Sequence, residues 1–187
     1  LSNLRKQSSQ ELDNLINKEL PELKLENARF ETYFEKDMPT ENGYDKVTFK
    51  IKTNPNSEMG SIKNVSSGGE LCRIALAIKV IAQKNSKTTM VFDEVDSGIG
   101  GAVSTAVGER LKKLGNAKQV IVVTHSPQVA AFGNDHFIVY KTVNNNESKI
   151  NLKQLDKDQK VNEIARMLSG KETTSEAINA AKKLINE

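Results

Sequence analysis

Polar side chains follow two apolar segments of this sequence, at the point where each segment ends. The acidic pair Asp93-Glu94 closes the run TTMVFDE (88–94), and His125 closes the run QVIVVTH (119–125). Short apolar runs without alternation predict strands that are buried on both faces of an α/β sheet. Because ligands bind beyond the carboxyl ends of parallel strands, we expect both polar groups to face one crevice.

The residue types at these two strand ends suit phosphate chemistry. Asp93 could hold Mg²⁺, which prefers a few carboxylates together with water and phosphate oxygens. Glu94 could orient or deprotonate an attacking water, and His125 could contact a γ-phosphate. Taken alone, the acidic pair fits a solvated strand end better, and a single histidine fits a structural role. The case for a site therefore depends on a third segment.

That segment is the loop SSGGE (66–70), which opens a helix expected from about Glu70 to Gln83. Serine hydroxyls, glycine amides and the positive end of a helix together attract anions. A phosphate-binding loop of the common kind also has the pattern G-x-x-x-x-G-K-[ST], and nothing in the 187 residues matches it. Either the loop is only a helix cap, or it completes a site whose other half lies elsewhere.

The remaining elements are read from periodicity. Apolar residues at helical spacing predict a helix over residues 1–20, stopped by Pro21, although the polar stretch Gln7 to Gln10 interrupts the stripe. This helix is either the end of a coiled coil or a helix packed on the body. Alternation over residues 23–52, with a turn near Gly43, predicts two or three antiparallel strands.

The second half of the chain predicts an α/β unit followed by a hairpin. A helix at about 102–114 separates the two apolar strands, which indicates a parallel core. The segments 136–141 and 148–153 flank three asparagines, 144–146, and read as an antiparallel hairpin. Two amphipathic helices follow, the first of them ending at Gly170.

Composition limits the class of protein. A chain of 187 residues is long enough for one domain with a core and a small appendage. The net charge of +3 is too small to indicate nucleic-acid binding without a local basic patch. One cysteine excludes a disulfide framework and favours a reducing compartment. No apolar run approaches the roughly 18 residues of a membrane span.

Taken together, the three segments resemble the second half of an ABC-type ATPase. VSSGGE resembles its signature motif, TTMVFDE its Walker B strand and VVTHS its switch histidine. Within that superfamily, SSGGELCRIALAIK, FDEVDSGIGG and VTHSPQVAAF are similar to the RecN family of bacterial DNA-repair proteins, relatives of the SMC proteins. The resemblance implies the C-terminal lobe of an ATPase head over residues 22–187, with residues 1–21 as the returning end of a coiled-coil arm.

The resemblance also assigns roles to residues. In ABC-type ATPases the signature loop caps the γ-phosphate bound on the partner subunit, so the partner's Walker A supplies the missing lysine. The resemblance implies that the ATP of the partner subunit is contacted by Ser67, Gly68, Gly69 and Glu70. It also implies that Asp93 is a ligand of the magnesium ion and that Glu94 and His125 are catalytic residues.

Walker A and its glutamine loop precede the arm in this family, and this chain has neither. The implied partners are the N-terminal Walker A lobe of the same protein, a second head in a homodimer, and DNA bound by the full-length protein. The implied setting is repair of double-strand breaks and recombination in the bacterial cytoplasm, at the nucleoid and not at a membrane. We expect this chain alone neither to bind ATP tightly nor to hydrolyse it.

Two other functions compete with this one. A transporter ATPase would continue DEP after the strand, where this chain has DEV. The next loop, DSGIGG, is glycine-rich as in RecN-like proteins and lacks the aspartate that transporters usually have there. A non-catalytic interaction module would need neither the acidic pair nor His125. Cys72 is interpreted as a small filler residue at the start of its helix, and His136 has no assigned role.

Overall fold

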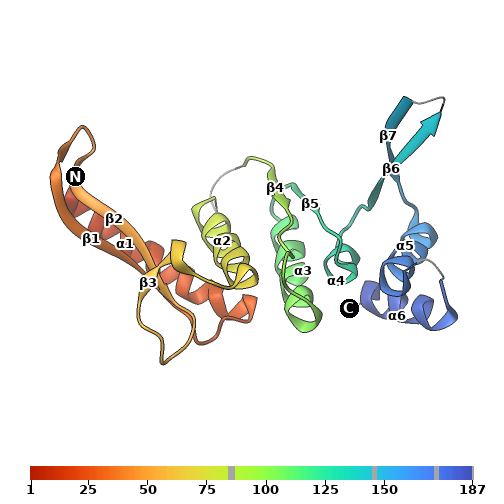
Figure 1. Ribbon diagram of the computed structural model, residues 1–187, viewed down its shortest axis with the longest axis horizontal. Helices are drawn as coiled ribbons and strands as arrows, with labels where there is room; N and C mark the ends of the chain where they lie inside the picture. Colours follow the sequence, from red (N-terminus) through yellow and green to blue (C-terminus); the bar gives the residue numbers. More distant parts are fainter. Residues whose placement is uncertain (84–86, 145–146, 171–172, 187) are drawn as a thin grey trace.

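The computed structural model describes residues 1–83, 87–144, 147–170 and 173–186 (Figure 1). Its helices and strands follow one another along an elongated molecule, with the N-terminal elements at one end and the C-terminal helices at the other. In chain order the elements are α1 (Ser2–Glu19), the 3-10 helix η1 (Leu20–Leu23), β1 (Arg29–Thr40), β2 (Gly43–Lys52), β3 (Gly60–Ser61), the 3-10 helix η2 (Ile62–Asn64), α2 (Gly68–Ala82), β4 (Met90–Asp93), α3 (Gly101–Gly115), β5 (Val120–Val123), α4 (Pro127–Ala131), β6 (Phe137–Asn144), β7 (Glu147–Gln154), α5 (Lys157–Ser169) and α6 (Ser175–Asn186).

The centre of the molecule is the predicted strand–helix–strand unit. Strands β4 and β5 pair in parallel, with Met90 opposite Val120 and Asp93 opposite Val123, and α3 makes the crossover between them. The side chains of α2 and α3 join those of β4 in one continuous hydrophobic cluster. The predicted α/β class with a parallel core is therefore confirmed.

The expectation that these two strands are buried on both faces is wrong for this chain. Met90 and Phe92 are buried, but Val91, Ile121 and Val123 are each about half exposed. Successive side chains of a strand point to opposite faces, and α2 and α3 supply apolar side chains to only one of them. The other face of the sheet is open.

An antiparallel sheet of order β1-β2-β3 lies beside α1, as predicted from the alternation in this part of the sequence. Helix α1 runs unbroken through Gln7 to Gln10. Its second half is held to the first strand, because the Asn17 side chain exchanges hydrogen bonds with the backbone of Phe30 and the Asp13 carboxylate accepts from the amide of Thr32. The predicted end at Pro21 falls within η1.

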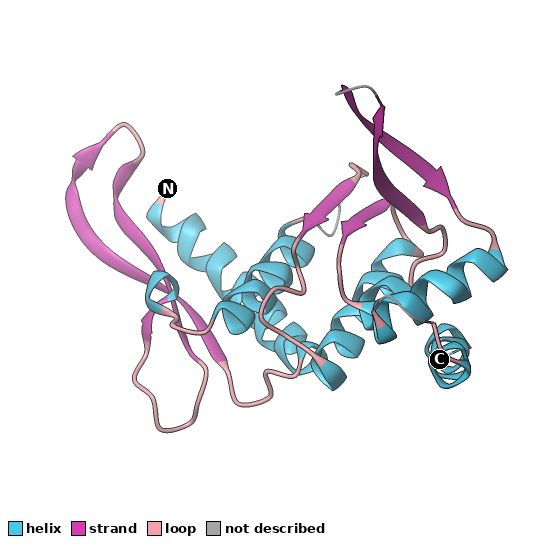
Figure 2. Ribbon diagram, turned by 45° about the vertical axis from the view of Figure 1, so that its right-hand side comes forward, coloured by secondary structure: helices cyan, strands magenta, loops and turns pink. Residues whose placement is uncertain are grey.

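The C-terminal part consists of the hairpin β6–β7 and helices α5 and α6. The strands pair antiparallel from Phe137 opposite Gln154 onwards, which confirms the predicted hairpin, and residues 145–146 of its predicted turn lie outside the described residues. Figure 2 shows the hairpin rising away from the helices. Helix α5 ends at Ser169, and Gly170 caps it with φ of +82°, which confirms the predicted glycine stop. None of the described helices has the length and apolar character needed to cross a membrane.

Candidate functional site

The acidic pair lies where β4 ends, and both side chains are exposed. Asp93 is the last residue of the strand, and Glu94 adopts a left-handed conformation with φ of +51°. This conformation costs about 1–2 kcal/mol for a residue other than glycine. The amide of Ser97 donates to the carbonyl oxygen of Glu94 at 3.0 Å, which closes a tight turn. The chain thus turns sharply and leaves two carboxylates in solvent at the carboxyl end of the sheet.

His125 follows β5 at the same edge of the sheet at which the acidic pair follows β4, because Asp93 and Val123 are paired in register. Its side chain is 81% exposed, and its Nδ1 lies 3.9 Å from Oδ2 of Asp96, too far for a hydrogen bond. Within the described part of the chain, no hydrogen bond or ion pair joins His125 to Asp93 or Glu94. The common edge is a feature of the fold, and the convergence of the three side chains on one ligand stays a prediction.

Asp96 lies beside the candidate site, and the sequence analysis did not identify it. Its side chain is fully buried, and its Oδ2 accepts hydrogen bonds from Thr124 Oγ1 at 2.6 Å and from the Ser126 amide at 3.0 Å. The only signal in the sequence is an aspartate two residues beyond the acidic pair, in DSGIGG. An aspartate before Ser-Gly reads as an ordinary turn residue, so its burial could not be foreseen.

The loop before α2 is partly on the surface. Ser67 is the N-cap of the helix, and its hydroxyl accepts from the Glu70 amide at 3.4 Å. Ser67 and Gly68 are exposed, and among the described residues nothing accepts a hydrogen bond from the amides of Gly68 and Gly69. The first turn of a helix leaves such amides available to an external acceptor.

The partner contact implied for residues 67–69 leads us to expect all three on the surface, but Gly69 is buried, so this expectation is wrong for Gly69. A Cβ on Gly69 would lie 2.8 Å from the carbonyl oxygen of Gly98 and 2.7 Å from Cγ2 of Ile99. The loop that follows the acidic pair therefore packs directly on the backbone of the serine-glycine loop. Only glycine fits at this contact.

A buried arginine holds the start of α2 from the other side. The Arg73 guanidinium donates to the carbonyl oxygens of Gly69 at 3.1 Å, and of Leu23 and Lys24 at 2.9 Å each. Burial lowers the pKa of Arg73, and the nearby acidic side chains of Glu70 and Glu26 oppose that shift. The first turn of the helix is thus tied to the segment that follows α1.

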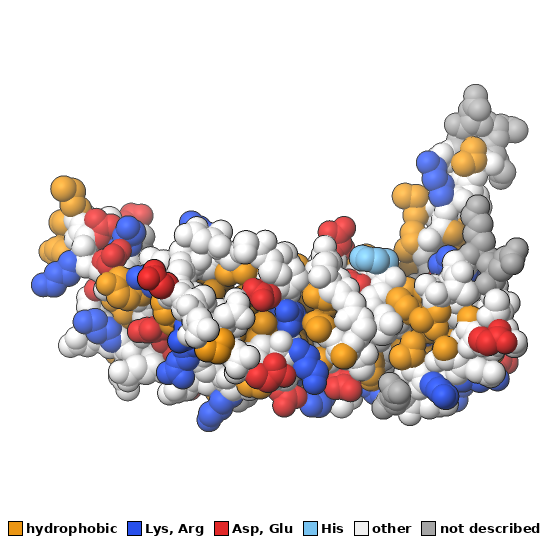
Figure 3. Space-filling view, turned by 60° about the horizontal axis from the view of Figure 1, so that its bottom comes forward, with side chains coloured by type: hydrophobic (Ala, Val, Ile, Leu, Met, Phe, Trp, Pro, Cys, Tyr) orange, Lys and Arg blue, Asp and Glu red, His pale blue; other side chains and the backbone are white. Residues whose placement is uncertain are grey.

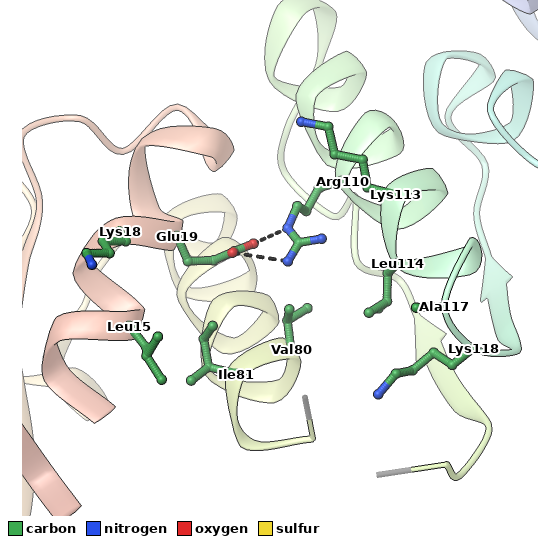
Figure 4. A pocket seen from close by; sticks show the side chains of 10 residues that line it. All are labelled: Leu15, Lys18, Glu19, Val80, Ile81, Arg110, Lys113, Leu114, Ala117 and Lys118. Carbon is green, nitrogen blue, oxygen red and sulfur yellow. Dashed lines mark hydrogen bonds and ion pairs between the residues drawn. The ribbon is translucent and has the colours of Figure 1, made fainter. Parts of the chain in front are cut away.

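The cavity shown in Figure 4 is separate from this site. It has a volume of about 350 Å³ and lies at the C-terminal ends of α2 and α3, whereas the serine-glycine loop lies at the N-terminal end of α2. The Arg110 guanidinium makes a bidentate ion pair with Glu19 across it, which joins α3 to α1. Its lining is formed by Leu15, Lys18, Glu19, Val80, Ile81, Arg110, Lys113, Leu114, Ala117 and Lys118.

Three further observations concern ligands and unassigned residues. Among the described residues, no three of the His, Cys, Asp and Glu side chains are grouped closely enough to hold a metal ion. Cys72 is a half-buried free thiol. His136 precedes β6, and burial, followed by the charge of Lys160, lowers its pKa despite the opposing effect of Glu163.

Comparison with known proteins identifies the family, although no protein-family model matches the chain. The sequence is 42% identical to DNA repair protein RecN of Rickettsia conorii over 176 residues, which are 94% of this chain and 32% of that protein. It is 41% identical to RecN of Vibrio cholerae, with 95% and 32% covered. It is 35% identical to RecN of Bacillus subtilis, with 100% and 35% covered.

The chain belongs to the RecN family. It spans about a third of the length of the curated relatives it matches and corresponds to a C-terminal part of RecN. This similarity favours RecN over a transporter ATPase subunit, the alternative considered in the sequence analysis.

Solved structures agree with RecN membership at the level of fold. A chain from work on ATP-driven dimerisation and DNA-stimulated activation of SMC ATPases superposes with a TM-score of 0.65 at 19% identity, with 92% of this chain and 99% of that chain covered. The Smc head domain with a coiled coil and joint from Pyrococcus yayanosii gives 0.64 at 16% identity, with 96% and 30% covered. This chain has the fold of a part of an SMC head.

Proposed function

We propose that this chain is the signature-bearing lobe of a RecN-type ATPase head that hydrolyses ATP between two engaged heads. The observation that carries the proposal is the pair of half-sites described above. One is the exposed acidic pair Asp93-Glu94 beside the His125 loop, and the other is the exposed cap Ser67-Gly68 with free amides. Neither contains a lysine, so each needs a second component.

The half-site at the end of β4 would act on ATP bound to the same head. Asp93 would hold Mg²⁺ together with phosphate oxygens, and the metal would neutralise charge on the phosphates. Glu94 would orient the attacking water and accept its proton, for which its solvent-facing position is suited. His125 would contact the γ-phosphate.

The half-site at the start of α2 would act on ATP bound to the partner head. The Ser67 hydroxyl and the amides of Gly68 and Gly69 would donate to the γ-phosphate, and the positive end of the helix adds to the attraction. Glu70 lies in the same first turn. The buried Gly69 would contribute its backbone only, and two such contacts related by a two-fold axis would close the dimer.

The open face of the central sheet supports a missing partner lobe. Val91, Ile121 and Val123 are exposed on one face, and β5 has an unpaired edge among the described strands. Figure 3 shows hydrophobic side chains gathered along the β6–β7 hairpin as well. We propose that the N-terminal Walker A lobe of the same protein covers these surfaces. The full-length protein would then bind DNA and act in double-strand break repair and recombination at the nucleoid.

The proposal is tested in two steps. Isothermal titration of the 187-residue chain with Mg-ATP should show no micromolar binding, because the Walker A cradle and its lysine are missing. Micromolar binding by this chain would refute the half-site interpretation. A non-catalytic module would give the same result, so the second step uses the full-length protein.

In the full-length protein, Glu94→Gln should bind ATP and stall in the engaged dimer, whereas Ser67→Arg should bind ATP and remain monomeric. Ser8→Arg adds the same charge to an exposed position of α1 and serves as the control. Light scattering with and without ATP distinguishes the three. Dimerisation of Ser67→Arg to the extent of the control would contradict the role of this loop in the partner's site.

A further inference from the structure

Asp96 is a buried carboxylate whose presence the turn after β4 does not require. Backbone hydrogen bonds already close that turn, from the Ser97 amide to the Glu94 carbonyl and from the Ile99 amide to the Asp96 carbonyl. The residue is only 1% exposed. Because removing an ionised carboxylate from water is unfavourable unless hydrogen bonds replace the solvent, its function must lie in the groups that it binds.

Those groups lie on both sides of His125. Asp96 Oδ2 accepts from Thr124 Oγ1 at 2.6 Å and from the Ser126 amide at 3.0 Å. Both bonds cross from the loop after β4 to the loop after β5. Hydrogen bonds to a charged acceptor are about twice as strong as neutral ones. The backbone is therefore anchored immediately before and immediately after the histidine.

His125 depends on this anchor, because its own side chain has no other support. The imidazole is 81% exposed and makes no hydrogen bond with any described residue. On the far side, the Ser126 hydroxyl caps α4 by accepting from the Val129 amide at 3.4 Å. The loop that carries the ring is thus fixed by Asp96 at Thr124 and Ser126, and by the helix cap at Ser126.

The second oxygen of the carboxylate indicates a role beyond packing. Oδ1 of Asp96 is buried and has no hydrogen-bond partner among the described residues. Unsatisfied buried oxygens are rare in native proteins and call for a specific explanation, often a functional one. A side chain retained for packing alone would be replaced by an apolar one at lower cost.

We propose that Asp96 is the positioning residue for His125. It holds the loop from Thr124 to Ser126 against the turn that carries Asp93 and Glu94, so that the imidazole keeps a fixed place relative to the acidic pair. This inference rests on the proposed ATP hydrolysis at that edge. Asp96 acts through its two hydrogen-bond donors and touches neither nucleotide nor metal.

The anchoring is tested first, without reference to hydrolysis, by amide hydrogen exchange at Ser126 in the full-length protein. Asp96→Ala removes one of the two acceptors of the Ser126 amide and leaves Thr124 Oγ1, which also lies at 3.0 Å, so exchange should accelerate by about tenfold. Asp96→Asn keeps a carbonyl oxygen and should give a smaller increase. Val107→Ala removes volume from a fully buried position of α3 and should leave exchange at Ser126 unchanged. Unchanged exchange in Asp96→Ala overturns the proposal.

The positioning effect is tested second, by ATP hydrolysis in the same variants. Asp96→Ala should lower kcat on the order of 10²-fold with little change in KM, as expected when a group is misplaced by about 1 Å. Asp96→Asn should recover part of that loss. Asp96→Ala combined with His125→Ala should be no slower than His125→Ala. Additive losses, or an equal loss in Val107→Ala, overturn the proposal.

The exchange measurement and a second variant distinguish failure of this proposal from failure of the proposed ATP hydrolysis or of folding. If the parent protein hydrolyses no ATP, the proposed function fails, whereas exchange at Ser126 still decides whether Asp96 anchors the loop. If Asp96→Ala does not fold, Thr124→Val keeps the carboxylate and removes one of its two donors, together with the second acceptor of the Ser126 amide. That variant should show faster exchange at Ser126 and a lower kcat, and parental values for both overturn the proposal.

Discussion

Substitution of Gly69 by alanine tests the contact between the serine-glycine loop and the loop after the acidic pair. An added Cβ would lie 2.8 Å from the Gly98 carbonyl oxygen and 2.7 Å from Ile99 Cγ2. The first of these atoms belongs to the backbone, in a residue with φ of +70°, and cannot rotate away. Gly68, the preceding residue, has no atom within 4 Å of its added Cβ and is the matched control.

The difference in unfolding free energy between Gly69→Ala and Gly68→Ala measures the steric cost of a Cβ at position 69. Both replacements gain the same helix propensity, at most about 1 kcal/mol, because both residues lie in the first turn of α2. Overpacking of a tight contact costs about 1–3 kcal/mol. We therefore expect Gly69→Ala to be less stable than Gly68→Ala by about 1–3 kcal/mol, with a Tm lower by about 2–12 °C for a chain of this size.

Thermal and urea unfolding of the two variants measure this difference, with m-values expected to be unchanged. In the full-length protein, the shifted backbone of Gly69→Ala should also weaken the proposed ATP-dependent head dimerisation, because we propose that its amide contacts the partner's γ-phosphate. Equal stability of the two variants, within about 0.5 kcal/mol, would refute the close approach of the two loops as a constraint on the fold.

Three further predictions follow from single residues. Glu94→Gly should raise Tm by about 2–8 °C by relieving the left-handed conformation, while Glu94→Ala should not, and both should abolish ATP hydrolysis by the full-length protein. Arg73→Met leaves three carbonyl oxygens without their donor and should destabilise the chain by about 1–3 kcal/mol, whereas Arg166→Met, at a surface ion pair, should change stability by at most about 1 kcal/mol, as urea midpoints will show. Burial lowers the pKa of His136 below its ordinary value of 6.5, so the unfolded chain binds the proton more tightly and stability should fall as the pH drops below 6.5. Urea midpoints of His136→Phe should lose that part of the pH dependence, and an identical pH profile in the variant would contradict the assignment.

Local patterns in the sequence determined most of the elements of this protein. The apolar runs ending at Asp93 and His125, with a helical period between them, specify a parallel strand–helix–strand unit, and alternation with a glycine turn specifies the hairpin β1–β2. Ser67 followed by two glycines specifies a helix start. These features depend on residues that are neighbours in the chain, so periodicity and capping preferences suffice to predict them. The order of the three motifs also indicated an ABC-type ATPase, and the residues within them indicated the RecN family.

Contacts between distant residues decided the rest, and only the tertiary structure contains them. Asp96 is buried because it meets Thr124 and Ser126, which lie about thirty residues away, and no local pattern encodes that meeting. Gly69 is buried because the loop containing Gly98 folds back on it. The central strands looked buried on both faces because their composition suits a complete sheet, whereas the side chains within this chain cover one face. A sequence records how apolar a residue is, but its neighbours in space determine which partner buries it.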